Sequence, residues 1–534
     1  MSSLRASCLG LAFALAAQGA AAATPEVEKL RAELETMKAE YARQAEQMRA
    51  LEERIRALEA PPASPSTPAA GKALADAGEM RQQVTKEFQN DTESREQALL
   101  NAKHPYADRI QEVLQGYMDI HGYFRAGYGR DSNGGSMVGF QAPGALAKYR
   151  LGNEPDTYGE ITFGKNFYGA GAFEFNDAGE VTAGAGPIGR FQTTLAAYTP
   201  IQDAISSGSA SFSFAEIWGS VGNVIASQPS LKFWAGNRYY RRHDIHMDDF
   251  FFSNMSGTGG GFEDLKLSFG KLALAWIGTP GSSGVSSAPV PDAANKAGFS
   301  KTSFDLRLYD MDVPGGTGEA GLVFSRATSG LDANGNQAPT STGFSGMFIH
   351  TRKGVFSEDG VNKASIQFGT GAAMTLNSGF ETFSLNGQTF IRPADADAWR
   401  VRVTENFTAN LSDSFSLGPV FVYQLTDYAG NEGKVQWVSA GLRPIWHFNQ
   451  RISLAMEGGA DWVKDDNART DGVLYKVTIA PQVSLGGRFM SRPVIRAFIT
   501  YASWSDDFVG LIGGRDFAEA NDALTAGMHM EVWW

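Results

Sequence analysis

Residues 526–534, AGMHMEVWW, are the stretch that says most about the fold. In an extended strand, successive side chains point to opposite faces. One face therefore carries Ala526, Met528, Met530, Val532 and Trp534, and the other carries Gly527, His529, Glu531 and Trp533. An apolar face with an aromatic terminus suits the last strand of a transmembrane β-barrel, which closes the sheet so that no backbone edge meets lipid. Trp533 is then expected to point into the lumen.

The same alternation runs back to Met118. Residues 118–128, 304–309, 399–404 and 473–479 all alternate apolar with polar or small side chains, and turn-forming stretches at 332–336, 385–387 and 429–431 separate such segments. A soluble sandwich or propeller alternates too, but in an exported, glycine-rich chain a lipid-facing barrel explains the pattern better. The length permits about 16 or 18 strands, and alternation alone does not distinguish the two counts.

Composition excludes several classes of protein. The 534 residues include 61 Gly and 35 Phe but only 19% charged residues, and no apolar run of about 18 residues follows position 23, which excludes a helical membrane protein. A net charge of -12 excludes a generic nucleic-acid binder. The only cysteine, Cys8, lies in a segment expected to be removed, so the mature chain is predicted to have no disulfide and no thiolate chemistry.

Residues 1–23 have the features of a secretory signal: Arg5, an apolar core at 9–17 and small residues at 20–23. A lipoprotein signal around Cys8 is less favoured, because Arg5 occupies a position where such signals want an aliphatic residue. The mature chain is therefore expected to leave the cytoplasm.

Residues 24–60 are predicted to form a parallel coiled coil. Apolar residues recur in a heptad at Val27, Leu34, Tyr41, Met48 and Ile55 and at Leu30, Met37, Leu51 and Leu58. A lone amphipathic helix is the alternative. A Pro/Ala-rich linker (61–73) and a helical or partly disordered periplasmic segment (74–116) follow, and 117–534 is the predicted barrel.

The barrel region resembles the maltoporin family of sugar-selective outer-membrane porins. The matching stretches are HGYFRAG (121–127), KYRLGNE (148–154), AGNRYYRRHDIHMDDF (235–250), SRPVIR (491–496) and MEVWW (530–534). The coiled-coil extension is similar to that of the sucrose-porin branch. The resemblance implies an 18-stranded antiparallel transmembrane barrel in the outer membrane, a homotrimer surrounded by lipid, an inward-folded third loop and carbohydrate solutes.

The resemblance also implies site residues. It places Tyr123, Tyr158 and Trp533 on an aromatic slide for sugar rings. It places Arg125, Arg150, Glu160, Arg242, Asp244, His246 and Asp249 on a polar track, with Phe251 at the constriction. These residue types suit a pyranose, because aromatic rings stack on its C–H face while charged groups bond its hydroxyls. Strand alternation independently predicts that Tyr123, Arg125 and Trp533 face the lumen.

Several positions depart from the family pattern. No tryptophan occurs between Tyr158 and Glu216, and the slide positions near Val361 and Met490 lack their aromatic residue, although Phe489 is a possible substitute. Gly139 and Pro155 replace the cysteine pair of the first external loop. The shortened slide weakens the case for long maltodextrins in particular.

Three other functions fit the sequence less well. A non-selective porin is the strongest rival, because charged residues line every water-filled porin. An enzyme is disfavoured, because none of the seven histidines accompanies a recognisable nucleophile motif. A metal site in residues 243–249 is disfavoured because arginines precede it. The sequence therefore predicts a channel with no catalytic residue, metal or cofactor.

Overall fold

The computed structural model describes residues 118–534, except for 176–180, 201, 203–209, 281–299, 329, 332–336, 339, 386–387, 393–394 and 431. The predicted signal sequence, coiled coil, linker and 74–116 segment all lie outside the described residues. Within the described ranges, no helix is long and apolar enough to cross a membrane.

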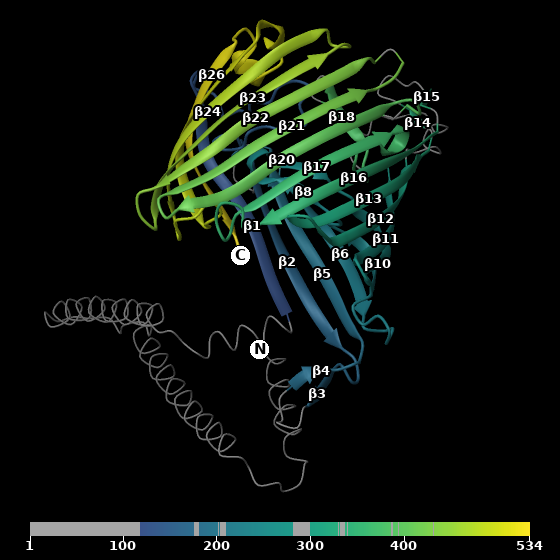
Figure 1. Cartoon of the computed structure of the whole chain (residues 1–534). Coiled ribbons are helices and arrows are strands. Elements are labelled where there is room, and N and C mark those ends of the chain that lie inside the picture. The colour runs from purple at the N-terminus through teal and green to yellow at the C-terminus, as the bar shows by residue number, and fades with distance from the viewer. Residues whose placement is uncertain are drawn as a thin grey trace, which may run out of the picture. The chain divides into compact units, whose positions relative to one another are not determined.

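The described residues form a closed antiparallel barrel of 18 strands (Figure 1). Each barrel strand pairs with the next one along the chain, and β26 pairs with β1 to close the ring. Along this seam Tyr123 lies opposite Trp533 and Asp131 lies opposite Thr525. This confirms the predicted barrel, the closing role of the last strand and the count of 18.

The barrel strands are β1 (Met118–Asp131), β2 (Thr157–Tyr168), β5 (Ile188–Thr199), β6 (Ser211–Gly222), β7 (Lys232–Arg238), β10 (Gly257–Leu267), β11 (Gly270–Pro280), β12 (Ser300–Val313), β13 (Gly316–Ala327), β16 (Ser341–Lys353), β17 (Val361–Thr370), β20 (Trp399–Ser412), β21 (Phe415–Asp427), β22 (Lys434–His447), β23 (Ile452–Asp465), β24 (Thr470–Ser484), β25 (Val494–Trp504) and β26 (Asp522–Trp533). Short hairpins off the barrel are β3 (Phe173–Phe175) with β4 (Val181–Ala183), β8 (His243–Ile245) with β9 (Phe250–Ser253), β14 (Gly330–Leu331) with β15 (Gln337–Ala338), and β18 (Glu381–Leu385) with β19 (Gln388–Arg392). Single 3-10 turns are η1 (His246–Asp248), η2 (Gly371–Ala373), η3 (Asp506–Phe508) and η4 (Gly514–Phe517).

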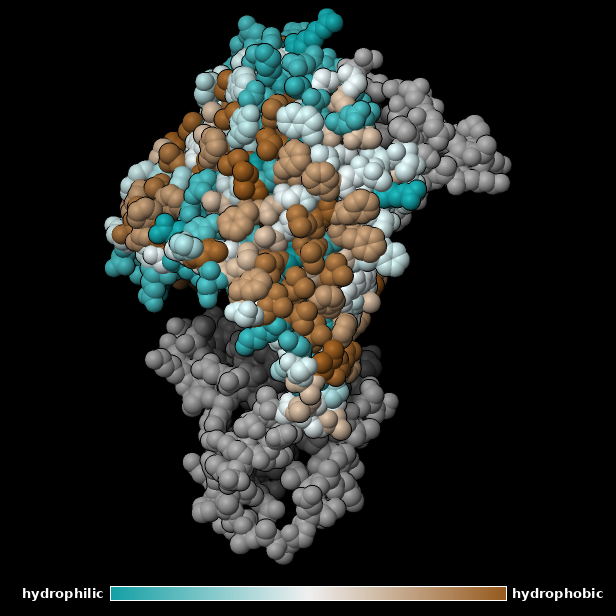
Figure 2. Space-filling model, turned by 45° about the vertical axis from the view of Figure 1, so that its right-hand side comes forward, coloured by the Kyte–Doolittle hydropathy of each residue, from teal (hydrophilic) through white to brown (hydrophobic). Residues whose placement is uncertain are grey.

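The outer surface is apolar because the strands alternate. On β24, Tyr475, Val477 and Ile479 are 57%, 47% and 46% exposed, whereas the side chains between them are buried. Exposed apolar side chains recur on the outward face of the other strands, and a broad apolar area lies between hydrophilic ends in Figure 2. Such a band is the surface that a transmembrane barrel presents to lipid.

The two ends of the barrel differ in their connections. Turns 268–269, 314–315 and 413–414 lie at one end, together with Met118 and Trp534, whereas connections such as 132–156 and 371–398 lie at the other. In outer-membrane barrels short turns face the periplasm and long loops face outside. Both ends of the barrel domain are therefore expected at its periplasmic side.

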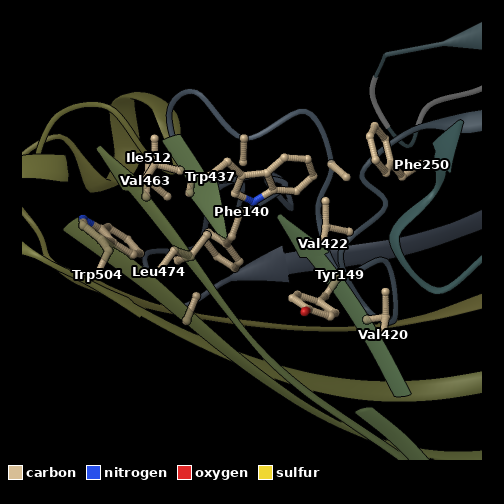
Figure 3. Packing of buried hydrophobic residues seen from close by; sticks show 14 of the residues in the cluster. Phe140, Tyr149, Phe250, Val420, Val422, Trp437, Val463, Leu474, Trp504 and Ile512 are labelled. Carbon is tan, nitrogen blue, oxygen red and sulfur yellow. The ribbon is translucent and has the colours of Figure 1, made fainter. Parts of the chain in front are cut away.

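Two loops fold inward and fill part of the lumen. Residues 132–156, the first loop, and 239–256, the inner loop, pack against the wall formed by β21 to β25 (Figure 3). The first loop contributes Phe140 and Tyr149, the inner loop contributes Phe250, and Trp437 of β22 meets Phe250 edge-on at 5.4 Å. The space on the other side of these loops stays open.

Two wall glycines make room for the first loop. The ring of Tyr149 lies over Gly441 and Gly459, where an added Cβ would overlap it. The Tyr149 hydroxyl also hydrogen-bonds Ser439 Oγ at 2.9 Å. The first loop thus packs against a part of the wall where two glycines leave room for the Tyr149 ring.

Candidate functional site

The open side of the lumen is a cavity of about 710 Å³. Its lining includes every residue predicted for the slide, the track and the constriction: Tyr123, Tyr158, Trp533, Arg125, Arg150, Glu160, Arg242, Asp244, His246, Asp249 and Phe251. The structure therefore brings these residues together, although their roles in binding a solute stay predictions.

Strand register places the three slide rings side by side. Tyr123 lies opposite Trp533 across the β1–β26 seam, and Arg125 lies opposite Tyr158 on β2. The ring centroids of Tyr123 and Tyr158 are 6.0 Å apart, and those of Tyr123 and Trp533 are 6.4 Å apart. The rings form one continuous strip on the cavity wall.

The two arginines beside this strip are held by carboxylates. Arg125 makes ion pairs with Asp156 at 2.6 Å, Glu154 at 3.1 Å and Asp249 at 3.4 Å. Arg150 pairs with Glu154 at 2.8 Å and donates to the Tyr123 hydroxyl at 2.7 Å. Glu154 and Asp156 were not predicted as site residues. Loop positions carry no alternation to mark them, although Glu154 lies inside the matching family stretch 148–154.

A second network surrounds Glu531, which accepts from Arg150 at 3.0 Å, Arg492 at 2.6 Å and Arg496 at 3.1 Å. The guanidinium of Arg492 lies over the Trp533 ring at 4.0 Å. Site prediction also missed Arg492 and Glu531. Alternation placed Glu531 on the lumenal face, and Arg492 lies inside a matching family stretch, so both signals were present.

His246, in η1 of the inner loop, meets the strip. Its Nδ1 lies 3.1 Å from Arg150 Nη1, and its ring contacts Trp533 edge-on at 5.5 Å. Burial and the Arg150 guanidinium lower the pKa of His246 well below its usual range, so the imidazole is neutral near pH 7. His243 instead faces Glu319, at 3.2 Å. No described group of three or more His, Cys, Asp or Glu side chains could hold a metal ion.

Arg242 and Asp244 differ from the other charged track residues. Among the described residues, neither makes a side-chain hydrogen bond or an ion pair, and Arg242 Nε is buried without a partner. The Arg242 guanidinium lies between two rings, 3.9 Å from Tyr239 and 4.1 Å from Phe251. Arg242 and Asp244 thus offer the cavity a donor and an acceptor that are not committed to other side chains.

Toward the short-turn end the strip of Tyr158, Tyr123 and Trp533 is not continued. Val361 and Met490 stand where the family pattern has rings, and Lys363, Asn406 and Thr408 join them. Phe489 also lines the cavity, but it is 5% exposed and packs in a buried cluster with Leu151 and Phe498. The aromatic strip is therefore short.

Asp248 lies behind the cavity, where the inner loop meets the wall. It is 2% exposed, and neither carboxylate oxygen has a hydrogen-bond partner among the described residues. Burial, followed by the charges of Asp461 and Glu457, raises the pKa of Asp248 well above its usual range. The docked loop therefore favours a protonated Asp248.

We expect docking of the inner loop to weaken as the pH rises. The pKa of Asp248 is higher in the docked loop than in the released loop. Protonated Asp248 therefore stabilises the docked loop fully below the ordinary aspartate pKa of about 4, and this stabilisation is lost as the pH rises through the raised pKa. Between these two pKa values, the ratio of docked to released loop should fall about tenfold per pH unit. Open-channel current noise, recorded against pH, measures this change.

Asp248→Asn mimics the protonated carboxyl and should make the noise independent of pH. Asp397→Asn, at an exposed loop position, should keep the wild-type dependence. A wild-type pH profile in Asp248→Asn would contradict the assignment.

A closed barrel with an apolar outer band and an open, polar cavity defines the class: an outer-membrane channel. Residues 118–534 match the LamB porin family, and the chain belongs to that family.

Solved structures of other porins are similar over the barrel. OccAB4 of Acinetobacter baumannii is 7% identical with a TM-score of 0.40, over 78% of this chain and 98% of that one. OccK8 (OprE) of Pseudomonas aeruginosa is 11% identical with a TM-score of 0.39, again over 78% and 98%. In vitro folded OmpT of Vibrio cholerae, in its trimer form, is 10% identical with a TM-score of 0.34, over 78% and 99%. Similarity at this level gives no information on solute or assembly.

Proposed function

We propose that this outer-membrane channel carries carbohydrates, such as maltose- or sucrose-type di- and oligosaccharides, by facilitated diffusion. The observation that supports this most is the continuous strip of Tyr158, Tyr123 and Trp533 facing charged groups across one cavity. Stacked rings take the apolar face of a pyranose, and the charged groups bond its hydroxyls.

The expected affinity suits transport. A site that binds too tightly releases its solute slowly, so conduction needs modest binding. Millimolar affinity corresponds to about 4 kcal/mol. Stacking contributes about 0.5 to 1.5 kcal/mol per ring pair, and each hydrogen bond that competes with water adds about 0.5 to 1.5 kcal/mol. Three rings and a few polar groups therefore suffice.

The charge pattern favours a neutral solute. Arg125, Arg150 and Arg492 are each compensated by carboxylates. Among the described lining residues, Arg242 and Lys363 carry positive charges and Asp244 and Glu160 carry negative charges that make no ion pair. An ion of either sign would be attracted by two of these charges and repelled by the other two. A polyhydroxy solute can donate to Asp244 and accept from Arg242.

Catalysis has no comparable support. Ser416 and His447 are in contact at 2.7 Å, yet both are buried and neither lines the cavity. The other His447 ring nitrogen has no partner among the described residues, so the orienting acid of a triad is missing there. The porin family and the channel fold support a transporter.

The test is sugar block of ion current through single reconstituted channels. A panel of mono-, di- and oligosaccharides should block saturably, with affinity rising only shallowly with chain length, because the strip is short. Unsaturable or absent block would instead indicate a non-selective diffusion porin.

Replacing Arg242 with alanine should weaken sugar block about three- to tenfold, because its donors are free for a solute. Salt conductance should stay similar or rise. No carboxylate depends on Arg242, so thermal stability should fall only by the lost packing on Tyr239 and Phe251. Arg125→Ala should also weaken block but lower stability, because three carboxylates each lose an ion pair. Lys464→Ala, outside the cavity, is the matched control, and unchanged block in Arg242→Ala would contradict its place on the track.

We also propose a homotrimer in the outer membrane, with residues 24–116 extending into the periplasm. The family and the apolar outer band support membrane insertion, and the predicted coiled coil favours self-association. Deleting residues 24–114 should leave a conducting barrel. Loss of folding or trimers in that variant would mean that the extension is needed to build the pore.

A further inference from the structure

Tyr239 is the first residue of the inner loop, directly after β7, and its backbone is firmly anchored. Its N–H donates to Glu216 Oε1 at 2.8 Å. Glu216 is 3% exposed and also accepts from Trp218 Nε1 at 3.2 Å and Thr194 Oγ1 at 2.7 Å. The start of the loop is thereby fixed to β5 and β6.

The Tyr239 side chain contacts two predicted track residues at once. Its hydroxyl donates to Glu160 Oε1 at 2.6 Å, the same oxygen that accepts from Tyr158. Its ring lies 3.9 Å from the guanidinium of Arg242, on which Phe251 also packs. No other described side chain contacts both Glu160 and Arg242 in this way.

Tyr239 does not line the solute cavity, whereas Glu160 and Arg242 both do. Tyr239 lines a second hollow of about 640 Å³, together with Glu216 and Arg238. A solute in the first cavity therefore contacts Glu160 and Arg242 directly, and Tyr239 acts on that solute through these two side chains.

We propose that Tyr239 is a positioning residue that holds the acceptor Glu160 and the donor Arg242 in a fixed mutual arrangement, and so sets the channel's stereochemical preference among sugars. This inference rests on the proposed carbohydrate transport. A rigid donor–acceptor pair binds best when two solute hydroxyls have one relative orientation. If Glu160 and Arg242 can move relative to each other, they bind hydroxyls in either orientation, and the channel discriminates less between sugar epimers.

The two contacts have separable effects. Without its hydroxyl, Tyr239 still supports Arg242, but Glu160 Oε1 keeps only Tyr158 as a donor. Without its ring, Arg242 keeps only Phe251, and its guanidinium gains freedom to turn. Tyr239→Phe therefore isolates the effect on Glu160, and Tyr239→Leu removes both supports.

The experiment measures sugar block in single channels of the full chain for Tyr239→Phe, Glu160→Gln and the double variant. The probes are a disaccharide that blocks the wild type and its epimer at one hydroxyl. Tyr239→Phe should weaken block about three- to tenfold and reduce the affinity ratio between the epimers. In the Glu160→Gln background, Tyr239→Phe should weaken sugar block by less than about twofold, because the contact between the Tyr239 hydroxyl and the Glu160 carboxylate is already altered there.

Tyr240→Phe is the matched control. The Tyr240 ring packs on Trp234 with centroids 5.1 Å apart, and its hydroxyl contacts no predicted track residue. Tyr240→Phe should leave both the affinity for the blocking sugar and the affinity ratio between the epimers unchanged. Tyr239→Leu should lower the epimer ratio further; if it does not fold, the Tyr239→Phe result alone decides.

Equal effects of Tyr239→Phe in the two backgrounds, or an unchanged epimer ratio, would overturn the inference while leaving sugar transport intact. Absence of block in the wild-type channel would contradict the proposed transport, and this inference with it.

Discussion

Replacing Tyr123 with alanine should weaken sugar block about ten- to a hundredfold. Tyr123 is the middle ring of the strip, in contact with both Tyr158 and Trp533. Its hydroxyl also accepts from Arg150 at 2.7 Å and donates to Glu531 at 3.2 Å. The variant loses a stacking surface and a hydrogen-bonded contact, each contributing about 0.5 to 1.5 kcal/mol. Concentration-dependent block of single channels measures the change.

Two variants on the same strand sharpen this test. Tyr123→Phe keeps the ring and should weaken block only about three- to tenfold. Tyr128→Ala removes a ring that is 60% exposed on the lipid side and should leave block unchanged. If Tyr123→Ala binds sugar as tightly as the wild type, the strip is not the sugar path.

Replacing Glu457 with alanine should destabilise the barrel by about 3 to 5 kcal/mol. Glu457 is 1% exposed and bonds Arg443, Lys476 Nζ at 2.9 Å and the N–H of Leu151 at 2.9 Å. Its loss leaves two buried cations without their carboxylate. The first loop also loses an anchor on the wall, although Lys476 still donates to the Leu151 carbonyl at 2.7 Å.

Equilibrium unfolding in denaturant measures the loss of stability, and protease cleavage of residues 132–156 measures release of the loop. Glu358→Ala removes an exposed carboxylate in turn 354–360 and should change neither. Wild-type stability in Glu457→Ala would show that this ion pair does not seat the first loop.

The barrel could be predicted from alternation, because a strand between lipid and water must put apolar side chains on one face. The strand count could not, because segments off the barrel carry the same local signals. The turn at 385–387 joins β18 and β19, and the stretch at 332–336 lies between β14 and β15, so neither separates two barrel strands. The correct count of 18 came only with the family resemblance.

The site likewise contains residues that the sequence predicts and residues that it does not. Strand positions such as Tyr123, Arg125 and Trp533 follow from alternation because their direction depends only on local geometry. Glu154 and Asp156 lie on a loop whose path is set by packing of Tyr149 on distant wall glycines. No local pattern encodes that contact.

The position of a blocking disaccharide in a structure of the channel decides whether the strip is the sugar path. We expect sugar rings stacked along Tyr158, Tyr123 and Trp533, with hydroxyls bonded to Arg242 and Asp244. Sugar bound elsewhere in the lumen, with this strip empty at a concentration that blocks the current, would contradict it.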